Sequence, residues 1–279
     1  MEPALITADP EVRQSAILRR YMDLPKLLDL LHTRSLYFRR ADGFSDRLEG
    51  ALFPSFRKTM DEAFARKEIP HDADHFYNRA RKGNYVSCWT IGARDNMALW
   101  QLFGNVKTSV AVTSTVDRLV SCGFDWNRRM HLHKVRYVDH RRVRTYVMGS
   151  FTDPLQYKSD SYKFERELRI ILPQQEVGWE ANPMGIRLAV SDLNVLVRSV
   201  VVAPEADGLI GLISNLAPII AGGNTCVALA SQSKPLCAVT LAEVLRAQGY
   251  RTGAAIGGFP LVARFGLDQG FEFYDDRLT

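Results

Sequence analysis

Apolar residues near the start of the chain follow first the spacing of a strand and then that of a helix. Residues 17–21 predict a short strand. A leucine stripe follows at Leu24, Leu27, Leu28 and Leu31. Because these positions are spaced i, i+3, i+4 and i+7, they lie on one face of a helix. Asp23 is the expected N-cap, and Pro25 fits the first turn, where no N–H is needed.

Strands and helices then mix without a strict alternation. Strands are expected over residues 35–38, 85–90, 109–112, 134–138, 168–172, 197–203 and 226–229. Helices are expected over residues 57–82 with a break at Pro70, over 96–103 and 207–220, and in a short segment that runs into Glu165. The last strand, helix and strand form a β-α-β unit. This mixture predicts one α+β domain over residues 1–238, with a twisted mixed sheet flanked by helices.

Composition indicates a folded core and no membrane segment. The 279 residues are 46% hydrophobic and 24% charged, as in ordinary globular proteins. The longest apolar stretch, residues 209–220, contains Pro218 and is shorter than a membrane span. The first residues lack the basic and apolar segments of a signal peptide. We therefore expect a cytoplasmic protein whose cysteines are free thiols: Cys88, Cys122, Cys226 and Cys237.

The formal charge of +5 is modest but unevenly distributed. Seven basic residues, called the basic strip below, lie close together against the single acid Asp139: Arg128, Arg129, Lys134, Arg136, Arg141, Arg142 and Arg144. Such a strip is more often a solvated strand and turn. It can also follow the phosphates of a nucleic acid, so nucleic-acid or nucleotide binding stays an alternative.

Polar side chains interrupt or adjoin four apolar segments, where an unpartnered charge would be costly. They are Arg20 with Tyr21, Asp46 with Glu49, Ser87 with Trp89 and then Trp100, and Lys158 with Glu165, Glu167 and Arg169. Glu165, Glu167 and Arg169 alternate, so on one strand they would share a face. Two such carboxylates repel each other unless a cation intervenes. We predict one pocket that brings together Glu165, Glu167, Arg20, Tyr21, Ser87 and at least one of Asp46 and Glu49.

Each polar group also has a purely structural interpretation. Asp46 is well placed to cap a turn, and Glu49 to form a local ion pair. Trp89 and Trp100 are more often core residues than parts of a site. The run from Glu165 to Arg169 would suit a salt-bridged strand face. The four groups are more suggestive of a site together than singly.

The order of these motifs resembles a bacterial family of unknown function, domain-of-unknown-function family 2971, over about residues 15–235. The matching residues are Arg20-Tyr21, Leu36-Tyr37-Phe38, Phe44-x-Asp46-x-x-Glu49-Gly50, Ser87-x-Trp89, Ala98-x-Trp100 and Lys158-Ser159, then Glu165-x-Glu167-x-Arg169. Ser45 and Arg47 stand where the family has Asn and Pro, so a looser turn at Asp46 is expected. The resemblance implies no defined activity.

The motif layout is also similar to that of ADP-ribosyltransferase toxins. The similarity implies that Arg20 holds the pyrophosphate of NAD and that Ser87 orients the ribose. Tyr21 or Trp89 would stack on nicotinamide. Glu165 or Glu167 would stabilise the positive charge that forms on the sugar as nicotinamide leaves. We therefore expect an NAD-using transferase that serves as a toxin or phage-defence effector.

Two other functions stay open. A nuclease or phosphodiesterase would bind Mg²⁺ through clustered carboxylates and use Lys158 to stabilise the phosphate. Its ligands would be Asp46, Glu49, Glu165 and Glu167. A non-enzymatic module would instead bind nucleic acid through the basic strip. His71 and His75 have helical spacing that suits a metal, but without a third ligand nearby we expect a surface pair.

Residues 239–279 differ in character from the rest of the chain. Residues 240–253, 264–271 and 274–276 closely resemble an internal piece of bacterial sulfatases. Leu241, Val244 and Leu245 would form one helical face, and residues 252–256 would begin a strand. The sulfatase nucleophile motif is absent, because Cys237 is followed by Ala-Val-Thr rather than x-Pro-x-Arg. We expect no sulfatase activity, and a loosely attached tail whose removal after Pro235 costs little stability.

Overall fold

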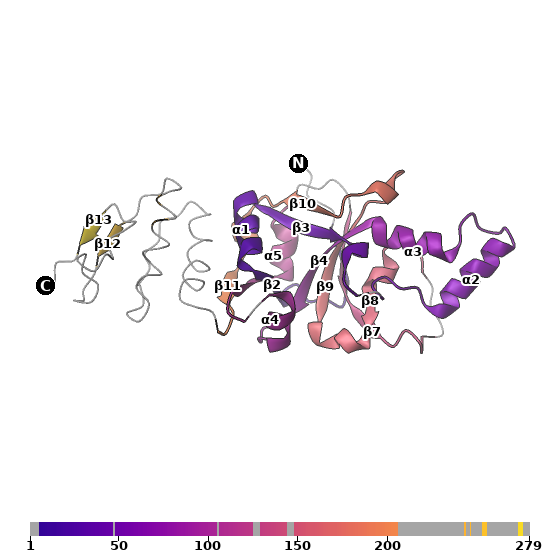
Figure 1. The fold of residues 1–279 in the computed structure, drawn as a ribbon, viewed down its shortest axis with the longest axis horizontal. Helices are drawn as coiled ribbons and strands as arrows, with labels where there is room; N and C mark the ends of the chain where they lie inside the picture. The colour runs from indigo at the N-terminus through magenta and orange to yellow at the C-terminus, as the bar shows by residue number, and fades with distance from the viewer. Residues whose placement is uncertain are drawn as a thin grey trace. The chain divides into compact units, whose positions relative to one another are not determined.

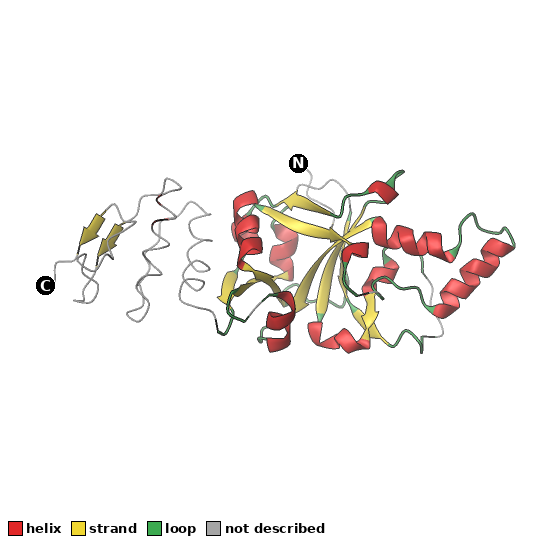
Figure 2. Ribbon diagram, in the orientation of Figure 1, coloured by secondary structure: helices red, strands yellow, loops and turns green. Residues whose placement is uncertain are grey.

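The computed structural model describes residues 6–46, 48–104, 106–124, 129–143 and 148–205, then Glu243, Arg246 and two short strands at 253–255 and 273–275. The chain divides into two compact units. The first comprises residues 1–20, 32–96 and 112–199, and the second comprises residues 21–31, 97–111 and 200–279. Helices and a mostly antiparallel sheet make the fold α+β, as predicted (Figure 1, Figure 2).

The main sheet combines parallel and antiparallel pairing. Its strands are β1 (Ile6–Ala8), β2 (Ile17–Asp23), β3 (Ser35–Arg40), β4 (Asn84–Ile91), β5 (Ser109–Thr115), β6 (Met130–Lys134), β9 (Glu167–Pro173), β10 (Gly185–Ala189) and β11 (Ser199–Val202). Their order is β1-β6-β9-β4-β2-β5-β11, with β3 beside β4 and β10 beside β3. β1 and β6 are parallel, whereas β9 is antiparallel to both β6 and β4.

The strand β4 is shared by two partners along one of its edges. One edge pairs with β9 over nearly its whole length. On the other edge, residues 85 and 86 pair with β3, and residues 90 and 91 pair with β2. The sheet therefore forks between β2 and β3, beside Ser87, Cys88 and Trp89 of β4.

The register of β4 and β9 assigns the predicted polar residues to two faces, because successive residues of a strand point to opposite sides. The Arg169 face carries Cys88 and Thr90 of β4 opposite Arg169 and Glu167 of β9. The Ser87 face carries Ser87 and Trp89 opposite Ile170 and Leu168.

Two hydrophobic clusters pack on the Arg169 face of the sheet. The nearer one contains Ala41, Val86, Leu155 and Ile171. The next contains Leu52, Phe53, Ala73 and Met148, with side chains of α2 (Pro54–Ala65) and α3 (Ala73–Lys82) packed against it. Asp72 caps α3 by accepting the His75 backbone N–H at 2.8 Å. The predicted helical segment is thus broken near Pro70, as expected.

The segment predicted as one strand over residues 134–138 is two strands with different partners. β6 ends at Lys134, and β7 (Arg136–Val138) pairs in parallel with β8 (Tyr157–Ser159). The 3₁₀ helices η2 (Asp153–Gln156) and η3 (Asp160–Glu165) flank β8. Between β6 and β7, the Val135 N–H bonds the Glu167 carbonyl at 2.9 Å. Because of this bond, the segment that contains β7 and η3 lies beside the first residues of β9. The first unit also holds η1 (Ala41–Gly43), η4 (Trp179–Ala181), α5 (Val116–Ser121) and α6 (Leu193–Leu196).

The second unit contains most of α1 (Leu24–Thr33) and all of α4 (Met97–Phe103). Asp23 accepts the Lys26 N–H at 3.0 Å, as expected of the N-cap. The predicted leucine stripe is wrong at one position, since Leu28 is 43% exposed and Leu30 is buried. The buried face of the helix is therefore rotated by about one position from the expected face. The core of this unit contains Tyr21, Leu99, Trp100, Ala111 and Ala203.

The C-terminal predictions are only partly within the described residues. The helix over 207–220 and the strand over 226–229 lie outside them, as do Leu241, Val244 and Leu245. Glu243 and Arg246 have helical backbone and are exposed. β12 (Gly253–Ala255) pairs in parallel with β13 (Phe273–Asp275). In the part of the chain that the structure describes, no helix is both long and apolar enough to span a membrane.

Candidate functional site

A cluster of buried charged side chains lies on the Arg169 face. Its members, called the ion network below, are Glu49, Lys158, Glu165, Glu167 and Arg169. None of them is more than 7% exposed. Buried charges are tolerated only when they are paired and hydrogen-bonded, so each contact in this network matters for folding as well as for chemistry.

Arg169 is fully buried on β9 and joins Glu49 to Glu167. Its guanidinium donates to both oxygens of Glu49, at 2.5 and 3.1 Å, in a bidentate pair. It also donates to Glu167 at 2.6 Å and to the Leu155 carbonyl at 2.7 Å. Together these bonds hold the Arg169 guanidinium in a buried position on the Arg169 face of the sheet.

Glu49 reaches Arg169 from a turn that Asp46 shapes. The Asp46 carboxylate accepts the Leu48 N–H at 2.9 Å, and its carbonyl accepts the Glu49 N–H at 3.2 Å. Gly50 follows with φ of 69°, a conformation that favours glycine. Asp46 therefore caps a turn, as its structural interpretation predicted.

Lys158 links the two glutamates at the start of β9. Its ammonium donates to Glu165 at 2.5 Å and to Glu167 at 2.7 Å, and lies 4.5 Å from the centre of the Tyr162 ring. Arg166, between the two glutamates, has φ of 49° and ψ of 49°. This left-handed residue turns the chain sharply, so that Glu165 from η3 and Glu167 from β9 both reach Lys158.

The ion network has one carboxylate more than it has cations. Glu49, Glu165 and Glu167 face Lys158 and Arg169. Burial and the adjacent Glu167 carboxylate raise the pKa of Glu165 to about 8. Although burial opposes it, Arg169 and Lys158 hold the pKa of Glu167 well below its ordinary value. One proton on Glu165 thus makes the network neutral.

Arg20 and Ser87 form a separate group at the fork of the sheet. Arg20 donates to the Ser87 hydroxyl at 2.9 Å and to the Tyr37 carbonyl at 3.1 Å, and its guanidinium carbon lies 6.0 Å from the Trp89 ring centre. The bond from Arg20 gives the Tyr37 carbonyl a donor at the point where β3 separates from β4. Burial lowers the pKa of Arg20 to about 10.

The prediction of one shared pocket is wrong for Arg20 and Ser87. Ser87 and Trp89 belong to the Ser87 face, whereas Glu167 and Arg169 belong to the opposite face. Arg20 contacts Ser87 and so lies on the Ser87 face as well. Alternation along β4 and β9 therefore prevents these side chains from lining one pocket. Of the predicted partners, the structure brings Glu49 to the two glutamates.

Tyr21 and Trp100 lie in the core of the second unit. Their rings meet edge to face with centroids 4.8 Å apart. Both are buried, as is Trp89 in the first unit. These contacts fit the core interpretation of the aromatic residues.

The carboxylates proposed for Mg²⁺ do not fit a metal site. Glu49 is held by Arg169, and Glu167 by both Arg169 and Lys158. Asp46 uses one oxygen to cap its own turn. A cation would have to displace the side chains that neutralise these oxygens. Among the described residues, no group of three His, Cys, Asp or Glu side chains could hold a metal ion.

The basic strip is exposed where the structure describes it. Its exposed members are Arg129, Lys134, Arg136, Arg141 and Arg142, while Arg128 and Arg144 lie outside the described residues. Arg142 pairs with Asp139 at 3.1 Å. Lys134 is opposite Leu168 in the register, on the Ser87 face. The described part of the strip therefore consists of exposed cations just before β6, on β6 and β7, and in the following turn.

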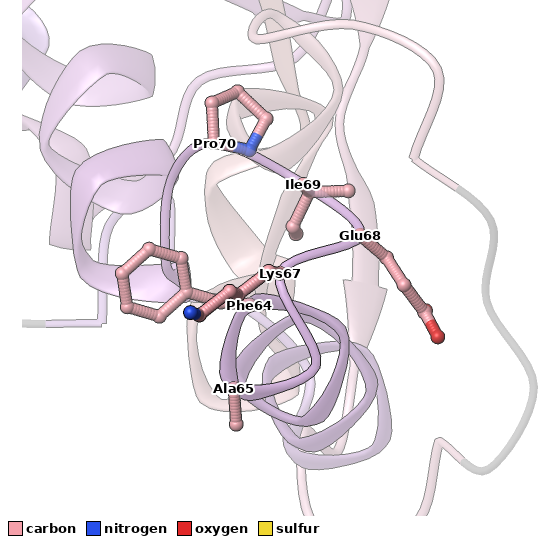
Figure 3. Close-up of a pocket in the computed structure, with 6 residues that line it drawn as sticks. All are labelled: Phe64, Ala65, Lys67, Glu68, Ile69 and Pro70. Atoms are coloured by element: carbon pink, nitrogen blue, oxygen red, sulfur yellow. The ribbon is translucent and has the colours of Figure 1, made fainter.

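A cavity of about 690 Å³ lies at the end of α2 and in the loop that joins it to α3 (Figure 3). Phe64, Ala65, Lys67, Glu68, Ile69 and Pro70 line it. Nearby on the chain, the His71 and His75 rings stack with centroids 3.7 Å apart. The lining of the cavity includes no member of the ion network.

Comparisons with protein-family models, with curated proteins and with solved structures find no match to this chain. The resemblances to the family of unknown function, to ADP-ribosyltransferases and to sulfatases therefore stay predictions. They depend on the order of motifs in the sequence.

Proposed function

We propose that this chain is a cytoplasmic enzyme that cleaves the bond between nicotinamide and ribose in NAD and passes the ADP-ribosyl group to a hydroxyl group or to water. The observation that supports the proposal is the pair Glu165 and Glu167. Two carboxyl groups two residues apart share Lys158, yet their surroundings move their pKa values in opposite directions. Pairs separated in this way serve as the acid–base groups of many enzymes.

Each glutamate would have a distinct part in the reaction. When the bond between ribose and nicotinamide breaks, its electron pair leaves with nicotinamide and positive charge develops on the sugar. Glu167, ionised at neutral pH, would stabilise that charge after the substrate has displaced Lys158 from its Oε1 atom. The attacking hydroxyl or water must lose a proton, and Glu165 would accept it. A base with a pKa near the working pH is best suited to this step.

Substrate would approach from the η3 side of the ion network rather than through the fork. Glu165 ends η3, and its neighbours Phe164 and Arg166 are exposed. Arg20, on the Ser87 face, is not assigned to this site. We therefore keep the roles that the similarity to ADP-ribosyltransferases implies for Glu165 and Glu167, but not the role that it implies for Arg20.

NAD consumption by Glu165→Gln tests the proposal. Glutamine reproduces the neutral form of Glu165, so the ion network keeps its charge and the chain should fold. We expect the rate of NAD consumption to fall at least about a hundredfold, the effect of losing a general base. Glu68→Gln, which removes a carboxylate paired with Arg66 on an exposed turn, is the matched control. Absence of NAD consumption by the unaltered protein, or equal rates in Glu165→Gln, would refute the proposal.

A second function, binding of nucleic acid, is favoured by the exposure of the basic strip. Arg129, Arg141 and Arg142 are open to solvent. Exposed cations bind phosphate backbones without sequence preference. This activity would not depend on Glu165.

A further inference from the structure

Glu49 belongs to the ion network through a single partner. Both oxygens of its carboxylate accept bonds from Arg169, at 2.5 and 3.1 Å. The Glu49 side chain is buried, and within the described residues no other side chain bonds its carboxylate. One positive charge of the network therefore compensates a carboxylate that lies outside the glutamate pair.

The bonds of the ion network form one continuous chain. From Glu49 they pass to Arg169 and on to one oxygen of Glu167. The other oxygen of Glu167 bonds Lys158, which also bonds Glu165. Glu167 thus contacts both cations, whereas Glu165 contacts only the cation that it shares with Glu167. A change of charge at Glu49 should therefore reach Glu165 at the far end of the chain of bonds.

The charge of Glu49 decides how many members of the glutamate pair can be ionised. Two buried cations neutralise two of the three carboxylates, and a net buried charge is costly. Glu49 uses one cation, so one positive charge is left for the pair. Glu167, between both cations, carries the negative charge, and the proton stays on Glu165. Without the charge of Glu49, both glutamates can ionise and the network is still neutral.

The other titratable groups close to the ion network do not alter this count at neutral pH. Burial raises the pKa values of Cys88 and Tyr137 and lowers the pKa of His140, so all three are uncharged. The Tyr137 hydroxyl accepts the Glu167 backbone N–H at 2.8 Å. Three further carboxylates act on His140 without bonding any member of the network: Asp46, Asp139 and Asp160.

We propose that Glu49 is a positioning residue for the glutamate pair: by occupying Arg169, it keeps the proton on Glu165 at neutral pH. The catalytic meaning of this inference rests on the proposed function, but the bonds and the charge count do not. A base that gains and loses its proton near the working pH is the most effective one. Glu49, acting through Arg169, thus sets the pH at which the pair can work.

Glu49→Gln tests this inference, because it removes the charge and leaves an amide oxygen that can accept from Arg169. We expect the titration of Glu165, followed by carboxyl ¹³C NMR of the full chain, to move to lower pH by at least about one unit. The midpoint of the pH–rate curve for NAD consumption should move in the same direction, whereas a merely structural loss would lower the rate at every pH. The control, Glu68→Gln, removes an exposed carboxylate paired with Arg66 and should move neither midpoint.

Combining two substitutions gives a readout that needs no activity. Glu165→Gln preserves the charge of the unaltered network, but in a Glu49→Gln chain it leaves two cations with one carboxylate. It should therefore lower the midpoint of urea unfolding at neutral pH in the Glu49→Gln chain and change it little in the unaltered chain.

Three results would overturn the inference: equal effects of Glu165→Gln in both chains, an unmoved Glu165 titration in Glu49→Gln, or failure of Glu49→Gln to fold at neutral pH. If the titration and the unfolding midpoints change as expected but the unaltered protein consumes no NAD, the inference stands and the proposed function fails.

Discussion

Arg169 is one of the two cations that balance the buried carboxylates of the ion network. It neutralises Glu49 and Glu167 and is itself fully buried. Removing one partner of a buried ion pair leaves the other charge without compensation. The cost of losing Arg169 should therefore exceed the cost of losing any surface arginine.

We predict that Arg169→Met destabilises the protein by about 3–5 kcal/mol, as expected when buried carboxylates lose their cation. Urea unfolding followed by circular dichroism measures the change. Arg142→Met removes an exposed arginine paired with Asp139 and should have no measurable effect. Equal midpoints for the two variants would show that the ion network contributes nothing.

Glu165 should make stability depend on pH. Its pKa is raised to about 8 in the folded state, against about 4.3 in an unfolded chain. The folded state therefore binds more protons between these values, and stability falls as pH rises through 8. Glu167 has the opposite shift, so its stabilisation is present above about pH 4.3 and is lost only in stronger acid.

We predict that Glu165→Gln removes the decline in stability between about pH 4.3 and about pH 8. Melting temperatures measured from pH 5 to 9 should decline less in the variant than in the unaltered protein, and near pH 9 the variant should be the more stable. Glu68→Gln again provides the control, because Glu68 is exposed. A decline of the same size in all three proteins would mean that Glu165 is already ionised at neutral pH.

At the scale of elements, the bend at Arg166 joins a 3₁₀ helix to a central strand. Its left-handed backbone costs an L-residue about 1–2 kcal/mol. The side chain is exposed, so substitutions there test the backbone rather than packing.

Arg166→Val should destabilise the protein by about 1–2 kcal/mol, because a β-branched side chain is poorly tolerated at positive φ. Arg166→Gly should stay close to the unaltered protein, because relief of strain offsets the flexibility that glycine adds to the unfolded chain. Thermal unfolding compares the two. The reverse order would mean that residue 166 does not have the left-handed conformation in solution.

Sequence periodicity predicted the central elements well because their burial is strong. β4 and β9 are nearly continuous runs of buried residues, and the leucine-rich helix begins at its expected cap. The convergence of Glu165, Glu167, Lys158 and Arg169 was also predictable, since they are close in sequence and need to neutralise one another.

The division of the predicted site between two faces could not be read from the sequence. Alternation tells which residues of one strand share a face, but not how two strands are aligned. Ser87 and Glu167 lie on different strands, and only the register of β4 with β9 separates them. The contact of the Tyr137 hydroxyl with the Glu167 backbone N–H could not be predicted either, because a bond to the backbone leaves no pattern in the side chains.

At the scale of the whole molecule, the charge of +5 and the exposed basic strip predict weak binding of polyanions. Affinity for a labelled RNA, measured by fluorescence anisotropy, should fall steeply between about 50 and 200 mM salt. Replacing Arg129, Arg141 and Arg142 with Ser should weaken binding. Replacing Arg13, Lys58 and Lys107 removes the same charge elsewhere and serves as the control. Equal loss in both triple variants would mean that net charge, and not the strip, attracts RNA.

The bidentate pair of Glu49 and Arg169 has a consequence for how this sequence can change over generations. Either residue altered alone leaves a buried charge behind, whereas replacing both with apolar residues of similar volume is often neutral for folding. A path between the two states passes through a poorly folded intermediate. We therefore expect these two positions, 120 residues apart, to vary together or not at all among descendants of this chain.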